Sequence, residues 1–397
     1  MSLLLAGAVN GCAAHGPPEP RPAATASASA TASAPPPNVD AADAGSADAS
    51  AAKPRATSLA CGERHCCAGF ESGEIRCWGS NSRGELGDGT EVSRPHPVLV
   101  ASAPERAREL PVQLSAANDR TCARMESGRA WCWGTRMFSN WNPTLTPTVV
   151  PGLDDAAEIA VGGRNACVRI KTGEMRCWGE VFRGYTPMPQ YRFLERMERM
   201  PIADVVEMAA GLTHTCARLK DGTIQCWGSN DEGELGNRSK TGGPWTDTPV
   251  EAKGLHGAKS IAAGMLHSCA ITQNATVACW GHNLFCGVGG IKKNQPRPTP
   301  VRGLENVVEV ALGIQSCART SDGQVLCWGF EHCEKCAICP PPKPIVGLPT
   351  IRKLALGWDF ACALSMDGDV YCWGGNSNIL RTDGTTVSGA EPVLVVW

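Results

Sequence analysis

Fourteen cysteines of this 397-residue chain stand in pairs whose spacing suits a disulfide across a β-hairpin. In the fullest copy, Cys216 and Cys226 bracket a turn at Asp221-Gly222. A three-residue bulged loop would place the two cysteines directly opposite each other, about 4.5 Å apart at Cα, at the short end of the disulfide range. The same spacing recurs in the pairs Cys67 and Cys77, Cys122 and Cys132, Cys167 and Cys177, Cys269 and Cys279, Cys317 and Cys327, and Cys362 and Cys372. We therefore expect one stapled hairpin in each copy.

The turn of each hairpin carries a residue suited to a left-handed backbone. Six copies have a glycine there, and in the copy that begins at Cys269 we expect Asn274 to take this role. Glycine has no Cβ, and Asn visits positive φ more readily than most residues. A Trp-Gly dipeptide follows the second cysteine of every copy, which makes the whole hairpin a repeated unit.

Seven further cysteines lie outside these pairs: Cys12, Cys61, Cys66, Cys286, Cys333, Cys336 and Cys339. Cys61 and Cys66 are close enough in sequence to pair with each other. The run Cys333–Cys339, with His332 beside it, has the ligand count of a closed zinc site, but its spacing is compressed and three prolines follow. We favour disulfides, formed within the run or with Cys286, over metal. The sequence predicts no metal or cofactor elsewhere.

Paired cysteines at this density predict an oxidising compartment, because cytosolic reductants would keep the thiols free. Residues 1–12 form a short apolar segment that resembles the end of a bacterial lipoprotein signal, in which Cys12 would be lipidated. The segment departs from that pattern in two ways: no basic residue comes first, and Asn10 stands where a small residue is usual. An ordinary secretory signal, or none, is the alternative. We expect a periplasmic or surface protein, an outer-membrane lipoprotein that touches the membrane only through this anchor.

Residues 13–56 consist almost entirely of Ala, Ser, Pro, Thr, Gly and Asp. Such a segment has too little bulky apolar surface to offset the entropy of ordering it. We therefore expect a disordered tether here, followed by a folded domain over residues 57–397.

The folded part repeats with the spacing of a propeller. The Trp-Gly pairs begin at Trp78 and recur every 45 to 55 residues up to Trp373. Each unit reads as four short strands, so seven units predict an all-β, seven-bladed β-propeller. A first strand from Thr57 and a last strand that ends at Trp397 should meet and close the ring, which would remove free sheet edges.

One repeat family matches the order of these motifs. The succession Ala-Ala-Gly211, His214-Thr-Cys-Ala, Cys226-Trp-Gly-Ser-Asn230 and Gly-Glu-Leu-Gly236 resembles the RCC1 (regulator of chromosome condensation) repeat. The loop Ser80–Thr90 is the closest match to its glycine-rich loop, and the resemblance covers residues 57–397. The chain is also similar to the secreted bacterial branch that includes a seven-bladed β-lactamase inhibitory protein. The resemblance implies a binding module. Guanyl-nucleotide exchange, which the family name suggests, is less favoured because an exported chain would not meet a cytosolic GTPase.

Composition and motifs exclude several functions. A net charge of −2 gives no basic footprint for nucleic acid. We find no nucleophile elbow, phosphate-binding loop or zinc-protease helix motif. We therefore predict a non-enzymatic, monomeric module that binds another protein or an envelope component. The alternative is a hydrolase or lyase that acts on polysaccharide at the propeller channel.

Two groups of residues remain open to two interpretations. His65, His214 and His267 each stand two residues before the first hairpin cysteine, where they would either line a rim or the channel, or be structural residues at a strand start. The segment Phe182–Pro201 carries aromatic and Met side chains, and would form either a partner-binding loop or a short covering helix.

Overall fold

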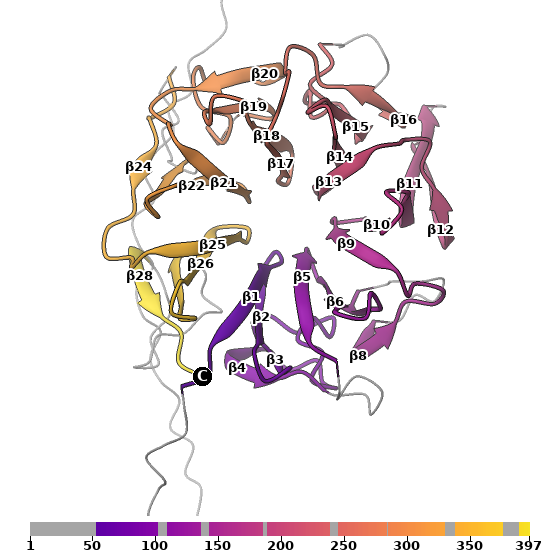
Figure 1. The fold of residues 1–397 in the computed structure, drawn as a ribbon, viewed down its shortest axis with the longest axis vertical. Coiled ribbons are helices and arrows are strands. Elements are labelled where there is room, and N and C mark those ends of the chain that lie inside the picture. Colours follow the sequence, from indigo (N-terminus) through magenta and orange to yellow (C-terminus); the bar gives the residue numbers. More distant parts are fainter. Residues whose placement is uncertain are drawn as a thin grey trace, which may run out of the picture. The chain divides into compact units, whose positions relative to one another are not determined.

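The computed structural model describes residues 53–101, 109–135, 143–185, 189–238, 245–283, 285–329, 338–375 and 389–397. These ranges form 28 strands in seven four-stranded antiparallel sheets, which stand around a common centre as propeller blades (Figure 1). Nowhere in these ranges is there a helix with the length and apolarity needed to cross a bilayer. Cys12 and the predicted signal and tether up to residue 52 lie outside the described residues.

Each blade uses four strands that are consecutive in the chain. The first three blades contain β1 (Ala56–Cys61), β2 (His65–Phe70), β3 (Ile75–Gly79) and β4 (Arg94–Leu99); β5 (Pro111–Ala117), β6 (Arg120–Met125), β7 (Ala130–Gly134) and β8 (Thr144–Val149); and β9 (Ala156–Val161), β10 (Asn165–Ile170), β11 (Met175–Tyr185) and β12 (Pro189–Arg199). The fourth and fifth contain β13 (Val205–Ala210), β14 (His214–Leu219), β15 (Ile224–Ser229) and β16 (Trp245–Glu251); and β17 (Ser260–Ala263), β18 (His267–Ile271), β19 (Val277–Gly281) and β20 (Gln295–Val301). The last two contain β21 (Val307–Leu312), β22 (Ser316–Thr320), β23 (Val325–Trp328) and β24 (Lys343–Pro344); and β25 (Ile351–Leu356), β26 (Phe360–Ser365), β27 (Val370–Gly374) and β28 (Gly389–Leu394).

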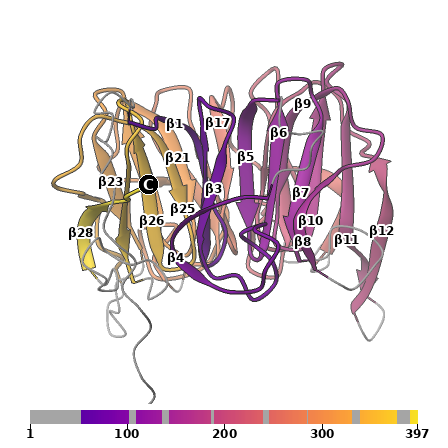
Figure 2. The same cartoon turned by 90° about the horizontal axis from the view of Figure 1, so that it is seen from below.

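The first strand of each blade lines the centre of the ring, and the strands stand roughly along the ring axis (Figures 1 and 2). Because the sheets are antiparallel, the turn between first and second strands and the loop between third and fourth strands lie at the same end. We call this end the mouth face. The tight turns of the stapled hairpins, between second and third strands, lie at the opposite end, the hairpin face.

The prediction for the segment Phe182–Pro201 was wrong, as the third blade shows. The segment from Phe182 to Pro201 forms neither a covering helix nor a separate loop, because most of it belongs to the eleven-residue strands β11 and β12. Its apolar residues alternate with polar ones at several positions, a pattern that also fits an extended strand.

The hairpins have the expected register. Cys216 is the Cα partner of Cys226, and the same opposition occurs in the other six blades. The structure joins all seven pairs by disulfides with Cα–Cα distances of 4.0–4.1 Å. A closed loop of this length restrains the unfolded chain by about 2–3 kcal/mol.

One turn differs from the expectation. In the hairpin of Cys269 and Cys279, the left-handed residue is Ala275, with φ of 57°, and not Asn274. Ala275 occupies the place that Gly222 holds in the fourth blade, where φ is 80°. Thus the register and the disulfide of this hairpin match the repeat, while its turn carries a backbone penalty, since a Cβ disfavours this region.

Neighbouring blades are held together by seven apolar clusters, each shared by two consecutive blades. Every cluster combines the hairpin cysteines of one blade with the Trp-Gly tryptophan of the next. Cys67 and Cys77 share a cluster with Trp133, for example, and Cys216 and Cys226 share one with Trp280. Burying a large side chain of this kind contributes on the order of 2–3 kcal/mol. The repeated disulfide thus forms part of the surface on which the next blade packs.

The ring closes by packing between complete blades. The first blade (β1–β4) and the last (β25–β28) each form their own sheet, so the terminal strands do not share one. Trp397 packs edge-on against Phe70, with ring centroids 4.7 Å apart, and against Trp78 at 5.7 Å. The amide of Ala56 donates to the carbonyl of Gly368 at 3.1 Å. The two ends therefore meet as expected, but through side chains and loop contacts and not through a shared sheet.

Replacing Ala275 by glycine should stabilise the protein by about 0.5–1 kcal/mol, because it removes the cost of a Cβ at positive φ. The matched control is Gly222→Ala, which places a Cβ 2.5 Å from the Cα of Gly257 and should destabilise by more than 1 kcal/mol. Denaturant unfolding of both variants measures this. Equal losses in the two variants would contradict the assignment of the left-handed residue.

Candidate functional site

The mouth face is built from the turns that follow the first strand of each blade. Most of these turns begin with a glycine because the carbonyl of the next blade occupies the space of its missing Cβ. A Cβ on Gly162 would lie 2.6 Å from the oxygen of Gly211, and one on Gly264 would lie 2.8 Å from the oxygen of Gly313. Real Cβ atoms do not approach carbonyl oxygens this closely, so the Ala-Ala-Gly motif reflects contact between blades.

The same turns are joined around the mouth by backbone hydrogen bonds. The residue after the glycine donates its amide to a carbonyl of the next blade at six of the seven blade interfaces. The bonds run from Glu63 to Asn118 (2.9 Å), Gly163 to Gly211 (3.0 Å), Leu212 to Gly264 (3.3 Å), Met265 to Gly313 (3.4 Å), Ile314 to Trp358 (3.4 Å) and Trp358 to Glu63 (3.0 Å). We call this set the mouth belt. It fixes the turns relative to one another before any partner arrives.

Four consecutive blades place an apolar side chain at the mouth. These residues, Leu212, Met265, Ile314 and Trp358, occupy the same turn position and form what we call the apolar arc. Trp358 is 37% exposed, and the other three are half-buried. Leu212, Met265 and Trp358 border a cavity of about 80 Å³ at the channel entrance. An apolar strip beside a concave entrance is a common setting for a protein contact.

The first two blades bring two carboxylates, Glu63 and Asp119, close together at the mouth, with Arg64 3.6 Å from Glu63. Burial raises the pKa of Glu63, the nearby charge of Asp119 raises it further, and Arg64 lowers it. Asp119 also raises the pKa of Glu85 in the glycine-rich loop, where burial is the largest cause. The mouth therefore has an apolar side and an acidic side, and a cation placed near Glu63 and Asp119 would relieve their repulsion.

The channel below the mouth is bordered mostly by small and aliphatic side chains, around a cavity of about 250 Å³. Three carboxylates lie on the first strands, and each pairs with an arginine of the second strand: Glu158 with Arg169, Glu207 with Arg218 and Glu309 with Arg319. Glu158 and Glu309 also accept the amides of Met208 and Leu354 in the following blades. These three carboxylates are therefore held in ion pairs and hydrogen bonds that connect strands and blades. Because they are paired, these three carboxylates of the channel wall do not form the free carboxylate pair that glycoside hydrolysis needs.

The three histidines are buried connectors between blades and do not line the channel. The Nε2 atoms of His65, His214 and His267 lie 2.7, 2.8 and 2.9 Å from a hydroxyl of the next blade. The hydroxyl partners are Thr121, Ser268 and Ser316. Burial lowers the histidine pKa values to about 3, about 4 and about 3, so the rings are neutral at pH 7. The structural interpretation of these residues holds, although the partner is a side chain and not the backbone.

The hydroxyls continue these contacts to the glycine-rich loops. Thr121 and the indole of Trp133 both donate to the carbonyl of Glu85, at 3.4 and 2.8 Å. Ser268 and Trp280 do the same to Glu234, at 3.3 and 2.7 Å. Sequence reasoning missed this role. The available signal was the Ser or Thr that stands directly before the first hairpin cysteine of the blade that follows each histidine.

The extra cysteines form disulfides where the structure describes them. Cys61 pairs with Cys66, and Cys286 pairs with Cys339 across two blades. Because Cys339 is bonded to Cys286, it is not free to act as a zinc ligand. Cys333, Cys336 and His332 lie outside the described residues. Cys286 takes the left-handed position of Gly84 and Gly233 in the glycine-rich loop, with φ of 63°.

Comparison with known proteins agrees with this geometry. Profiles described as the regulator of chromosome condensation (RCC1) repeat match residues 56–85, 205–234, 258–287 and 351–378, and also 72–124 and 221–271. Mouse E3 ubiquitin-protein ligase HERC2 is 25% identical over 260 residues, which cover 64% of this chain and 4% of that protein. Ultraviolet-B receptor UVR8 of Arabidopsis thaliana is 34% identical over 88 residues, 22% of this chain and 19% of that protein. The chain thus spans only a small part of these curated relatives.

Solved structures share the fold at low identity. The crystal structure of Prp20p from Saccharomyces cerevisiae superposes with a TM-score of 0.71 at 21% identity, over 82% of this chain and 86% of that chain. Human WBSCR16 gives 0.66 at 16% identity, over 78% and 87%. The protein is a seven-bladed β-propeller. The segments that the profiles match are RCC1 repeats, and the ring shares its fold with RCC1-like propellers.

The buried histidines make stability depend on acid. Their pKa values in the fold lie below the unfolded value of about 6.5, so the unfolded chain binds more protons and stability falls as pH drops from about 6.5 toward 4. Each histidine contributes up to about 1.4 kcal/mol per pH unit in that window. The triple variant His65→Asn, His214→Asn and His267→Asn copies Asn165, which bonds Thr215 at 3.4 Å. The pH at which half of the variant is unfolded by acid, followed by tryptophan fluorescence, should be lower than in the wild type, because the variant lacks these three groups that take up protons on unfolding. Asparagine at the exposed His256 should leave the midpoint unchanged, and an unchanged triple variant would refute the prediction.

Glu234 gives the stability of the fold the opposite dependence on pH. Burial raises its pKa to about 7, so the fold keeps the proton longer than the unfolded chain and stability decreases as pH rises from about 4.5 to 7. Glu234→Gln keeps an acceptor for the Glu232 amide, now bonded at 2.9 Å. At pH 8 the variant should be more stable by on the order of 1–3 kcal/mol, with little difference at pH 4. Urea unfolding at both pH values, with the exposed Glu91→Gln as control, checks this. A variant that loses stability at both would contradict it.

Proposed function

We propose that this protein is an exported binding module, whose mouth face engages another protein or an envelope component. The observation that carries the proposal is the apolar arc beside the acidic Glu63 and Asp119, held by the mouth belt. Such a surface suits a segment with an exposed apolar residue and a basic residue close to it. Rigid turns lower the entropy cost of binding, because the surface needs no ordering when the partner docks.

Export and anchoring form the second part of the proposal. Residues 1–12 would act as the signal, with Cys12 as the lipid-bearing residue, and residues 13–56 would serve as the tether. The disulfides of the described residues are compatible with an extracellular or periplasmic protein. A tethered propeller would present one face at variable distance from the membrane and reach large partners there.

Two other functions are less well supported. Cleavage of a polysaccharide by a hydrolase or a lyase would need free carboxylates in the channel. The carboxylates Glu158, Glu207 and Glu309 of the channel wall are paired with arginines. Nucleotide exchange on a small GTPase would need a cytosolic location, which the disulfides argue against. Release of reducing sugar from wall material by the purified chain would favour the first of these over binding.

The proposal predicts that Trp358→Ser strongly weakens partner capture. Truncating a half-exposed tryptophan at the centre of an interface typically costs at least about 2 kcal/mol, or roughly 30-fold in Kd. The chain would be immobilised, exposed to the envelope fraction of its producing organism, and the retained proteins quantified by mass spectrometry. The control is Met366→Ser, which removes a 56% exposed apolar side chain from the hairpin face.

A protein kept by wild type and Met366→Ser but lost with Trp358→Ser supports the mouth face. Its affinity should also weaken with Glu63→Gln and with added salt. If the wild type and both variants retain the same proteins equally, the mouth face is not the binding surface and the proposal is wrong.

A further inference from the structure

The interface between the first and last blades differs from the other six. No segment of the folded chain passes directly from β28 to β1, whereas every other pair of neighbouring blades is linked through the chain. We call this interface the closing seam. Its side chains share one apolar cluster that includes Cys61, Cys66, Cys362 and Cys372.

Cys66 stands where four of the other six blades carry a hydroxyl and the remaining two an alanine. The residue before the first hairpin cysteine is Thr121 in the second blade and Ser268 in the fifth. In both, its oxygen contacts a hairpin sulfur of the preceding blade, Cys67 at 3.9 Å and Cys216 at 3.7 Å. The fold thus holds this position against the preceding disulfide. At the closing seam the hydroxyl is replaced by sulfur, and the histidine that would bond it is replaced by Phe360.

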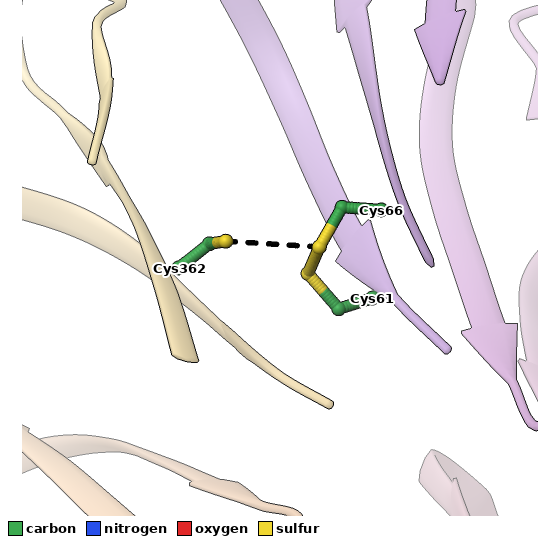
Figure 3. A group of neighbouring side chains, drawn as sticks. All are labelled: Cys61, Cys66 and Cys362. Carbon is green, nitrogen blue, oxygen red and sulfur yellow. Dashed lines mark hydrogen bonds between the residues drawn. A yellow bond between two sulfur atoms is a disulfide. The ribbon is translucent and has the colours of Figure 1, made fainter. Parts of the chain in front are cut away.

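The sulfur atoms at the seam are in direct contact. The Sγ of Cys66 lies 3.6 Å from the Sγ of Cys362 (Figure 3). Neither sulfur carries a hydrogen, because Cys66 is bonded to Cys61 and Cys362 to Cys372. These bonds also make the sulfur group unsuited to a metal in this oxidation state, although three of its atoms lie close enough together for one.

The sulfur atoms of Cys61, Cys66, Cys362 and Cys372 form a row, and only the Cys61 end of this row approaches the channel. Cys61 borders both the mouth cavity and the channel cavity and is 7% exposed, whereas Cys66, Cys362 and Cys372 are fully buried. A thiolate from solvent would therefore reach Cys61 first. Attack there would leave the negative charge on Cys66, beside the second disulfide.

We propose that the closing seam is a thiol–disulfide exchange site, which converts to a Cys66–Cys362 bond when a dithiol reductant enters the mouth. The reductant's thiolate forms a bond to Cys61 and breaks the Cys61–Cys66 bond, and the electron pair leaves on Cys66. Cys66 then bonds to Cys362 and releases Cys372, which takes a proton. The reductant's second thiol frees Cys61 and leaves as a cyclic or protein disulfide. Two electrons and two protons pass from the dithiol to Cys61 and Cys372.

The exchange would change what the cysteines restrain. The present bonds close loops with sequence separations of 5 and 10 residues, whereas Cys66 and Cys362 are 296 positions apart. The new bond would fasten the first blade to the last, the one interface that the chain itself does not cross. Reduction would thereby lock the ring against opening at its seam.

The most direct test uses Cys61→Ser, which frees the Cys66 thiol without any reductant. We expect the thiol to move to Cys372 through formation of the Cys66–Cys362 bond, at an unchanged oxidation level. The full chain would be labelled with N-ethylmaleimide in acidic denaturant, which stops exchange, and the labelled cysteine located by mass spectrometry. Label on Cys372 should exceed label on Cys66 by about threefold or more. The matched control, Cys66→Ser, should keep its label on Cys61.

A thiol that stays on Cys66 in Cys61→Ser would overturn the proposal. If that variant does not fold, wild type treated with limiting dithiothreitol decides. A link between the tryptic peptides that hold Cys66 and Cys362, with label on Cys61 and Cys372, supports exchange. Label on Cys61 and Cys66 with the Cys362–Cys372 bond intact contradicts it.

Discussion

The close approach of neighbouring blades at the mouth is the constraint on which the rest of the ring depends. A carbonyl oxygen of one blade lies where the Cβ of the preceding turn would be, so that turn must carry glycine at positions such as Gly162 and Gly264. The approach lets the next amide donate across the interface and complete the mouth belt. Hydrogen bonds of this kind contribute about 1 kcal/mol each, and leaving the buried groups unpaired would cost more. A larger residue at one turn would therefore disturb two blades.

The disulfides and tryptophans add a second level of connection between blades. Each staple restrains its own hairpin, yet it also supplies apolar surface to the cluster that receives the next tryptophan. The indole of Trp133 in turn donates to the carbonyl of Glu85, so the glycine-rich loop of one blade is held by the next. The turns that carry the apolar arc are held separately, by the backbone hydrogen bonds of the mouth belt. A rigid ring with variable turn residues is how propellers carry many different binding surfaces.

The sequence was sufficient for the fold because its signals repeat. Cys216, Cys226 and Gly222 occur at matched places in other units, and opposition across the strands follows from turn length alone. The choice of Asn274 was wrong because it followed the preference of Asn for positive φ, whereas the position that glycine holds in the other copies, six residues after the first cysteine, is Ala275 here. The His65–Thr121 contact and the apolar arc escaped prediction for a different reason. Both join residues about 50 positions apart, and only the ring brings these side chains together.

Hydrogen exchange of the mouth-belt amides tests the central claim most directly. The amides of Leu212, Met265 and Trp358 belong to turns at the molecular surface, where an unbonded amide exchanges rapidly. If they donate to the next blade, their protection should approach that of the strand core and be lost only with unfolding of the ring. The exposed turn amide of Asp221 serves as the rapid reference. Exchange of the three amides at the rate of Asp221 would mean that the blades do not meet in this way at the mouth.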